Sequence, residues 1–220
     1  MIELKKVTRT YEMGEEIIYA LHDVDLKLKD GEFVAIQGPS GSGKSTLANI
    51  IGGLDQPTSG KIVVNDEDLS KLKDKALSNY RNKKIGFIFQ TFNLQPIYNA
   101  LENVIVPLLF AKVPRKIRKQ KAIDCLKAVG MSDRMKHRPN ELSGGQRQRV
   151  CIARALVNDP KIIIADEPTG NLDTKKGEEI VALLRKLNKE KNITLIVITH
   201  DSKVARAADR ILNIQDGKIK

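Results

Sequence analysis

The sequence predicts an α/β domain with a mostly parallel sheet, and three observations lead to this prediction. Short apolar runs alternate with longer amphipathic runs, which is typical of layered strands and helices. The runs IIIA and LIVI are continuous and rich in β-branched residues, as expected of strands buried on both faces. A glycine-rich turn, GPSGSGKS, stands between a predicted strand and a predicted helix.

The predicted elements divide the chain into a core and an insert. The strands are expected at 2–7, 17–20, 33–37, 61–64, 85–89, 161–165, 193–198 and 210–214. The helices are expected at 44–52, 74–81, 100–109, 115–129, 145–157, 174–190 and 202–208. The middle of the chain has helices and no convincing strand. We therefore expect one domain, 1–220, with a core of about 1–90 and 158–220, an N-terminal antiparallel portion, and a helical subdomain of about 91–157.

Composition limits the class of protein. The formal net charge of +11 is compatible with nucleic acid, anionic lipid or phosphate-bearing small molecules as partners, and the basic runs 112–121 and 134–138 carry much of it. Cys125 and Cys151 have no metal-like spacing, so we expect reduced thiols. The start of the chain has no apolar stretch of signal-peptide type. The least charged window, 85–111, is interrupted by polar residues and proline, so we predict no membrane-spanning helix.

The turn GPSGSGKST has the spacing of a loop that cradles phosphate groups. Its glycines let backbone N–H groups face phosphate oxygens, and the following helix adds the positive end of its dipole. We expect Lys44 to reach the β- and γ-phosphates and the Ser45 hydroxyl to bind Mg²⁺. The expected nucleotide-binding residues are Gly38, Pro39, Ser40, Gly41, Ser42, Gly43, Lys44, Ser45 and Thr46.

Polar residues follow two further buried strands, where ligands bind in open α/β sheets. Asp166 is the expected metal partner of Ser45, and alternation along the strand predicts that Glu167 points the other way, toward an attacking water. His200 follows ITLIVIT and is expected to orient that water. Gln90 follows strand 85–89 and is expected in the water shell of the metal.

A second turn, LSGGQ, also fits an anion. Ser143 is a favoured N-cap, and Gly144 and Gly145 remove side chains that would block an approaching phosphate. Because a nucleotide has one γ-phosphate, we expect this turn to contact the nucleotide held by a second copy of the chain. Two copies placed head to tail would then form two composite sites, each with Lys44 of one copy and Ser143 of the other.

Together these segments resemble the nucleotide-binding subunits of ABC transporters over essentially the whole chain. The resemblance rests on the phosphate loop, LSGGQ at 142–146, ADEPTGNLD at 165–173 and the strand that ends before His200. It implies ATP hydrolysis with Mg²⁺, a homodimer, a separate integral membrane permease, and a location at the cytoplasmic face of the membrane. It also implies that Tyr11 stacks on adenine, that Gln146 belongs to the nucleotide contacts, that Gln90 begins a loop facing the permease, and that 171–173 crosses the dimer.

The segments EPTGNLD, FNLQP and ALENV resemble the exporter and mechanotransmission branch, which includes MacB-type macrolide efflux, LolD-type lipoprotein release and peptide-antibiotic resistance systems. The chain stops soon after its last predicted strand, so we expect no C-terminal regulatory domain. We also expect an apolar groove for a helix of a membrane protein, formed by Phe92, Leu94, Ile97, Tyr98, Leu101, Val104 and Leu108. The transported substrate cannot be inferred from these residues.

The alternative is an ATPase of the same superfamily that acts on nucleic acid in repair or translation. Lys44 and Ser143 lie too close in sequence for the long coiled coil of repair ATPases, and no heptad run separates them. The chain has neither zinc-type cysteines nor a second cassette, so no nucleic-acid partner is expected. Glu167 argues against a third alternative, a regulatory binder without catalysis.

Overall fold

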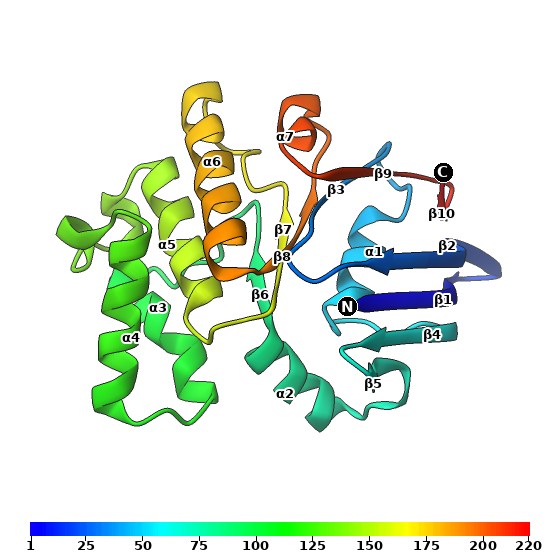
Figure 1. The fold of residues 1–220 in the computed structure, drawn as a ribbon, viewed down its shortest axis with the longest axis horizontal. Helices are drawn as coiled ribbons and strands as arrows, with labels where there is room; N and C mark the ends of the chain where they lie inside the picture. The colour runs from blue at the N-terminus through cyan, green and yellow to red at the C-terminus, as the bar shows by residue number, and fades with distance from the viewer.

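The structure is a computed structural model that describes residues 1–220, and it contains two β-sheets flanked by helices (Figure 1). The four-stranded sheet has the order β2-β1-β4-β5, and the six-stranded sheet has the order β10-β9-β3-β8-β7-β6. The strands are β1 (Ile2–Met13), β2 (Glu16–Leu28), β3 (Phe33–Gln37), β4 (Ser59–Val64), β5 (Glu67–Asp68), β6 (Ile85–Ile88), β7 (Ile162–Asp166), β8 (Thr194–Ile198), β9 (Arg210–Gln215) and β10 (Lys218–Ile219).

The α-helices are α1 (Lys44–Ile51), α2 (Asp74–Lys84), α3 (Ala100–Phe110), α4 (Arg115–Ala128), α5 (Gly144–Leu156), α6 (Thr174–Lys191) and α7 (Ser202–Arg206). Three short 3₁₀ turns complete the list: Leu69–Lys71, Ser132–Arg134 and Pro139–Glu141. Every helix and strand predicted from the sequence is present. The α/β fold with a mostly parallel sheet and an N-terminal antiparallel portion is therefore confirmed.

The antiparallel sheet departs most from the prediction. β1 and β2 extend well beyond the predicted ranges 2–7 and 17–20, and they pair out to Met13 and Glu16. In β1 no residue after Thr8 is buried, so the missed half has no alternation of buried and exposed side chains. In β2 the missed part, residues 21–28, does alternate, and the prediction overlooked it. The two-residue strands β5 and β10 were not predicted, because segments this short carry no periodic signal.

The parallel sheet brings the ends of distant strands to one edge. β3, β6, β7 and β8 run parallel, and Asp166 at the end of β7 pairs in register with Ile198 at the end of β8. Side chains alternate across β7: Ile162 and Ile164 face one buried cluster with α1, and Ile163 and Ala165 face the other with α3 to α6. The carboxyl edge of this buried sheet therefore holds the polar residues that follow each strand.

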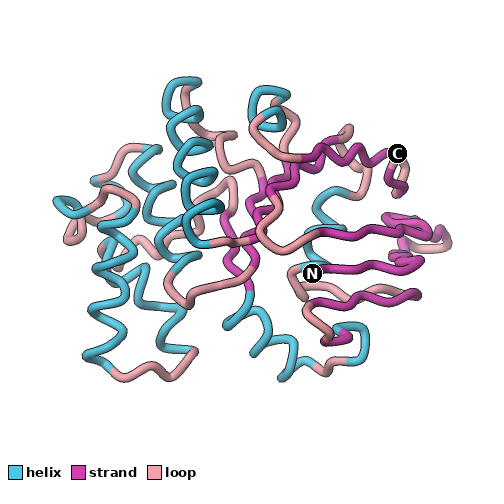
Figure 2. Tube along the Cα trace, viewed as in Figure 1, coloured by secondary structure: helices cyan, strands magenta, loops and turns pink.

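The helical segment between β6 and β7 lies to one side of the parallel sheet, and the antiparallel sheet lies to the other (Figure 2). Helices α3, α4 and α5 pack on one another there, with no strand between them, as predicted. The division into a core and an inserted subdomain stays a prediction. No helix combines the length and the apolar character that crossing a membrane would require.

Candidate functional site

The glycine-rich loop between β3 and α1 is pressed against neighbouring backbone. A Cβ atom on Gly43 would lie 2.3 Å from the carbonyl oxygen of Ala20, and one on Gly38 would lie 2.1 Å from that of Ile214. Gly43 also has φ +103, a conformation that disfavours any side chain. The loop therefore requires glycine at these two positions.

The start of α1 is suited to an anion. Its N-cap is Gly43, which offers no side-chain oxygen to the first-turn N–H groups, and the first turn has no acidic residue. The Lys44 ammonium donates to the carbonyl oxygens of Gly38 (2.9 Å) and Pro39 (2.7 Å), so it lies across the loop. The buried Ser42 hydroxyl has no hydrogen-bond partner within the protein. Free backbone donors, a cation and an unsatisfied hydroxyl together fit phosphate oxygens.

Asp166 and Glu167 lie at the carboxyl edge of the sheet, but the direction of the Glu167 side chain has a different cause from the predicted one. Glu167 is not part of the strand, so alternation does not set its direction. It has φ +46, a left-handed conformation that is uncommon for residues other than glycine, and its N–H donates to the Ile198 carbonyl at 3.0 Å. Strained backbone of this kind clusters at functional sites.

Glu167 and His200 form a direct pair. The Glu167 Oε1 atom lies 2.7 Å from His200 Nδ1 and accepts a hydrogen bond from the His200 backbone N–H at 3.1 Å. The carboxylate is nearly buried, whereas the imidazole is largely exposed. The structure thus brings the two residues predicted to position water into one unit.

The Asp166 carboxyl lies in an environment that favours a bound cation. Burial raises its pKa, the neighbouring Glu167 carboxylate raises it further, and the Lys44 ammonium partly opposes both effects. Ser45, at the start of α1, and Asp166 supply oxygen ligands, the kind that Mg²⁺ prefers. No group of three or more His, Cys, Asp or Glu residues forms a metal cage. These residues fit Mg²⁺ bound together with phosphate oxygens, as is usual for this ion.

Gln90 lies at the same edge and contacts the loop after β7. A Cβ atom on Gly170 would lie 2.6 Å from Gln90 Nε2, and the Asn171 side-chain amide donates to the Gln90 carbonyl at 2.8 Å. The Gln90 side chain is exposed next to this loop. Its predicted place in a metal water shell stays a prediction.

The LSGGQ turn forms a complete capping box at the start of α5. The Ser143 Oγ accepts from the Gln146 N–H at 3.3 Å, and the Gln146 side chain accepts from the Ser143 N–H at 2.9 Å. Gly144 faces Leu172, and Gly145 faces Lys176, so the turn rests on the start of α6. Figure 1 shows α5 and α1 on opposite sides of the parallel sheet. One chain therefore does not bring Ser143 to its own Lys44.

Tyr11 lies near the end of β1, in a cluster that the sequence did not reveal. Its hydroxyl donates to Asp55 at 2.6 Å, and the Arg9 guanidinium lies 4.6 Å from the centre of its ring. Arg9 also forms an ion pair with Asp55 at 2.9 Å. The ring remains 37% exposed, so it retains accessible area for stacking. The predicted adenine contact is compatible with this arrangement and stays a prediction.

Helix α5 holds the loop after Gln90, which the sequence analysis missed. Arg154 donates to the Phe92 carbonyl at 2.8 Å and also to that of Asn93, and Arg147 stacks over the Phe92 ring. Phe92 and Asn93 both have left-handed backbone, with φ +59 and +49. No sequence pattern marks these contacts, because they join side chains to backbone carbonyls roughly sixty residues away along the chain.

The predicted apolar groove is wrong in most of its members. Val104 and Leu108 are fully buried, and Leu94 and Leu101 pack against the same core; only Ile97 and Tyr98 are clearly exposed. The structure instead has a cavity of about 440 Å³ between α2, β6 and the end of α3. Its lining includes Leu54, Phe87, Phe89, Val106, Pro107 and Phe110. The prediction failed because helical periodicity does not distinguish the core face from an open apolar face.

Comparisons with known proteins agree with this site. The ABC transporter family profile matches residues 21–170. An uncharacterized ABC transporter ATP-binding protein of Methanocaldococcus jannaschii is 54% identical, covering 100% of this chain and 95% of the relative. The lipoprotein-releasing system ATP-binding protein LolD of Syntrophus aciditrophicus is 45% identical, covering 100% and 98%. The macrolide export protein MacB of Rhodopirellula baltica is 47% identical, covering 100% of this chain but 32% of that longer protein.

A solved structure is also similar to this chain. It is described as the dimeric structure of a post-hydrolysis state of the ATP-binding cassette MJ0796 bound to ADP and Pi, and it superposes with a TM-score of 0.91. The two proteins are 52% identical, and the match covers 100% of this chain and 97% of that one. The fold and its sheet-edge site define a phosphate-loop ATP-binding cassette. The chain belongs to the ABC transporter family.

Proposed function

We propose that the chain is the ATP-hydrolysing subunit of a membrane transporter and closes on two ATP molecules as a head-to-tail homodimer. One observation carries the proposal: helix α1, which begins at Lys44, and helix α5, which Ser143 caps, lie on opposite sides of the parallel sheet within one chain. A second copy would supply the missing half of each site. The similarity to a cassette described as dimeric and bound to ADP and Pi supports this arrangement.

The residues of the sheet edge would divide the work of hydrolysis. Lys44 and the loop N–H groups bind the phosphates. Glu167 orients the attacking water, and His200 fixes the position of the Glu167 carboxylate. Ser45, Asp166 and Gln90 would hold Mg²⁺, which neutralises charge on the transferring phosphoryl group. Ser143 and the glycine N–H groups of the second copy would bind the γ-phosphate from the other side. The nucleotide contacts otherwise stay as predicted, with Tyr11 against adenine.

The contacts of the Gln90 loop would connect hydrolysis to a membrane partner. Asn171 holds the loop from the β7 side, and Arg154 holds it from helix α5. The 440 Å³ apolar cavity lies beside this loop and fits a short helix from a permease. A change at the γ-phosphate is thus able to reach the partner through the loop after β7, the Gln90 loop and helix α5.

We further propose that the partner is an integral permease of the exporter or mechanotransmission type and that the chain works at the cytoplasmic face of the membrane. The similarity to proteins named for lipoprotein release and for macrolide export supports this branch. The core and the helical subdomain, 91–157, would then act as the two parts that close around ATP. The nature of the transported substrate depends on the permease.

Replacement of Glu167 by Gln tests the dimer directly. The variant retains the shape of the side chain but loses the basic carboxylate, so we expect ATP to bind and a closed dimer to accumulate. Size-exclusion chromatography with light scattering, with and without Mg²⁺ and ATP, measures the mass. Wild-type turnover per chain is expected to rise with protein concentration. A variant that stays monomeric at saturating ATP, together with a turnover independent of concentration, would refute the proposal.

A further inference from the structure

A basic pocket of about 340 Å³ lies between α2 and the turn that joins α3 to α4. Three lysines line it, Lys75 and Lys83 from α2 and Lys112 from the turn, and the lining contains no acidic residue. Ser78, Asn79, Asn82, Phe110 and Ala111 complete the wall. Elsewhere in the molecule lysines such as Lys27 and Lys121 are neutralised by acidic partners. The pocket therefore offers cationic donors and amides to an anion.

Hydrogen bonds hold the two walls of the pocket together. Asn82 of α2 donates to the Pro107 carbonyl of α3 at 3.1 Å, and Asn158 donates to the Asn82 carbonyl at 2.9 Å. The end of α3 adds a further clue. Lys112 follows the helix with φ +56, where helices commonly place glycine, and it keeps a long cationic side chain despite the backbone strain.

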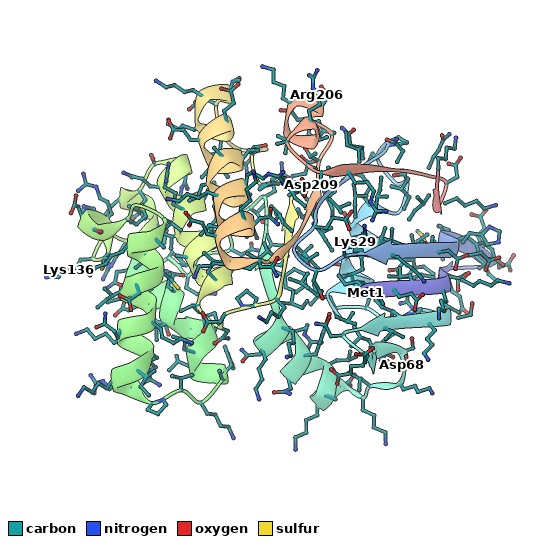
Figure 3. All side chains as sticks on the ribbon, viewed as in Figure 1. Met1, Lys29, Asp68, Lys136, Arg206 and Asp209 are labelled. Atoms are coloured by element: carbon teal, nitrogen blue, oxygen red, sulfur yellow. The ribbon has the colours of Figure 1, made fainter.

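The surroundings of the pocket combine positive charge with exposed apolar side chains. Residues 105–119 contain five basic residues and no Asp or Glu. Phe110 is 76% exposed, more than any other large apolar residue of the chain, and Ile117 is 52% exposed. Figure 3 shows nitrogen-tipped side chains projecting from α2 and from the nearby ends of α3 and α4. The apolar permease cavity shares Phe110 with this surface.

We propose that this surface binds the phosphate headgroups of anionic lipid, with one phosphate in the pocket and Phe110 and Ile117 at the level of the headgroups. Basic residues near an anionic bilayer add affinity one by one, and exposed apolar side chains add a second anchor. Single-stranded nucleic acid would instead call for several aromatic side chains that stack on bases, and the pocket wall has only Phe110. The proposal does not depend on ATP hydrolysis, because none of these residues belongs to the sheet-edge site.

Vesicle sedimentation tests the proposal with the full chain. Wild-type protein is mixed with vesicles of phosphatidylcholine alone or of phosphatidylcholine with phosphatidylglycerol. We expect binding only to the anionic vesicles. A triple variant, Lys75→Glu, Lys83→Glu and Lys112→Glu, is expected to bind at least about a hundredfold more weakly, because each basic residue near the surface accounts for about fivefold. The control triple variant, Lys29→Glu, Lys136→Glu and Lys203→Glu, has the same formal net charge, and its sites lie on other parts of the surface.

The outcomes distinguish lipid binding at this surface from a general effect of net charge. Full affinity in the control triple variant, together with weaker binding of the pocket triple variant, supports the proposal, whereas an equal affinity of the two triple variants overturns it. Equal binding of the wild type to both kinds of vesicle also overturns it. A labelled oligonucleotide that loses binding to the pocket variant, while vesicle affinity is unchanged, assigns the surface to nucleic acid instead. The ATP turnover of the pocket variant without vesicles is expected to equal that of the wild type, so failure here leaves the proposed ATPase untouched.

The single change Lys112→Gly separates folding from binding. Glycine relieves the left-handed strain, so the thermal unfolding midpoint is expected to stay at or above that of the wild type. Affinity for anionic vesicles is expected to fall about fivefold, the effect of one basic residue at the surface. A purely structural role of Lys112 predicts a changed midpoint with unchanged vesicle binding, and that result would overturn the proposal.

Discussion

The phosphate loop and the LSGGQ turn both present the first N–H groups of a helix, but they satisfy those groups differently. At α1 the N-cap is a glycine, and no side chain reaches the first turn. At α5 the Ser143 and Gln146 side chains form a reciprocal capping box. The first turn therefore depends on a ligand for its hydrogen bonds, whereas the second is stable without one. This difference explains how the LSGGQ turn can stay ordered while it lies apart from the phosphate loop of its own chain.

The two regions also differ in their neighbours. Lys44 lies close enough to Asp166 to affect its pKa, so the phosphate loop is surrounded by the groups of the sheet edge. The Ser143 residue is exposed, and the glycines that follow it, Gly144 and Gly145, face Leu172 and Lys176 of the same chain. This difference supports the proposal that the phosphate loop binds the nucleotide of its own chain and that the LSGGQ turn completes the site of a second copy. The following variants test that assignment.

The change Ser143→Arg should produce the largest effect. A bulky cation at the exposed turn would prevent the close approach of a second chain, while the phosphate loop remains intact. Groups supplied in trans accelerate related phosphoryl transfers by about 10³-fold or more, so turnover should fall about a thousandfold. Phosphate release measures turnover, and fluorescent nucleotide titration should show near-normal binding to the monomer.

The variant Ser143→Ala is the matched control for the cap. It removes the capping hydroxyl, at a cost of about 1 kcal/mol in folding free energy, without adding bulk. We expect a far smaller loss of turnover than with Arg. Equal turnover in wild type and Ser143→Arg would show that the turn does not approach the nucleotide of another chain.

The change Arg154→Ala addresses the link between the two regions. Arg154 holds the strained backbone at Phe92 and Asn93, and its loss leaves two carbonyls without their charged donor. Urea unfolding should show a loss of about 2 kcal/mol. Hydrogen exchange should rise in the loop after Gln90 before it rises in β7. Arg154→Lys, which keeps the charge but not the fork of donors, should recover only part of the loss. Unchanged exchange in this loop would argue against the link.

Much of the fold could be predicted because its signals are local. Strand β3 was predicted at 33–37 and is found at Phe33–Gln37, and α5 was predicted at 145–157 and is found at Gly144–Leu156. β3 is a continuous apolar run and α5 is an amphipathic run, and each borders a glycine-rich turn. β1 was underestimated because none of its residues after Thr8 is buried, so that half shows no alternation. In β2 the alternation from Leu21 to Leu28 is present in the sequence and was overlooked.

The candidate site shows the same limit. The motifs that contain Lys44 and Asp166, and the LSGGQ turn, have residue spacings that phosphate and metal binding require. They could therefore be named from the sequence. The left-handed backbone of Glu167 and the contact of Tyr11 with Arg9 and Asp55 depend on tertiary packing. Such contacts join residues by their position in space, and no one-dimensional pattern encodes them.

The change Tyr11→Ala should weaken ATP binding about tenfold, because stacking of an aromatic side chain on a base contributes roughly 1–3 kcal/mol. Tyr11→Phe removes the hydrogen bond to Asp55 but keeps the ring, so its affinity should stay close to that of the wild type. Inorganic triphosphate lacks the base and serves as the control ligand. If Tyr11→Ala weakens ATP and triphosphate equally, the ring supports the loop and does not contact adenine.

The change Asp166→Asn should have the smallest effect on the stability of the ligand-free chain, and the size of this effect depends on pH. Burial and the nearby Glu167 raise the pKa of Asp166 above its ordinary value of 3.8. The unfolded chain therefore loses this proton at lower pH than the folded chain, so ionisation of Asp166 reduces the free energy of unfolding at neutral pH. The amide has a similar shape and carries no charge. Without nucleotide, Asp166→Asn should unfold at a slightly higher temperature than the wild type at pH 7, and the difference should shrink as the pH falls toward 3.8.

Addition of Mg²⁺ and ATP should reverse this order, because bound ligand stabilises the folded state and the Asn variant holds the metal less well. Thermal unfolding with ATP in EDTA separates the metal from the nucleotide: the wild type should lose most of its advantage there, whereas the variant should change little. An Asn variant that is destabilised without ligand, at every pH, would show that Asp166 is a structural hydrogen-bonding group. An Asn variant stabilised by Mg²⁺ and ATP as much as the wild type would remove Asp166 from the metal site. Either result would leave the phosphate loop as the only region that responds to ligand within a single chain.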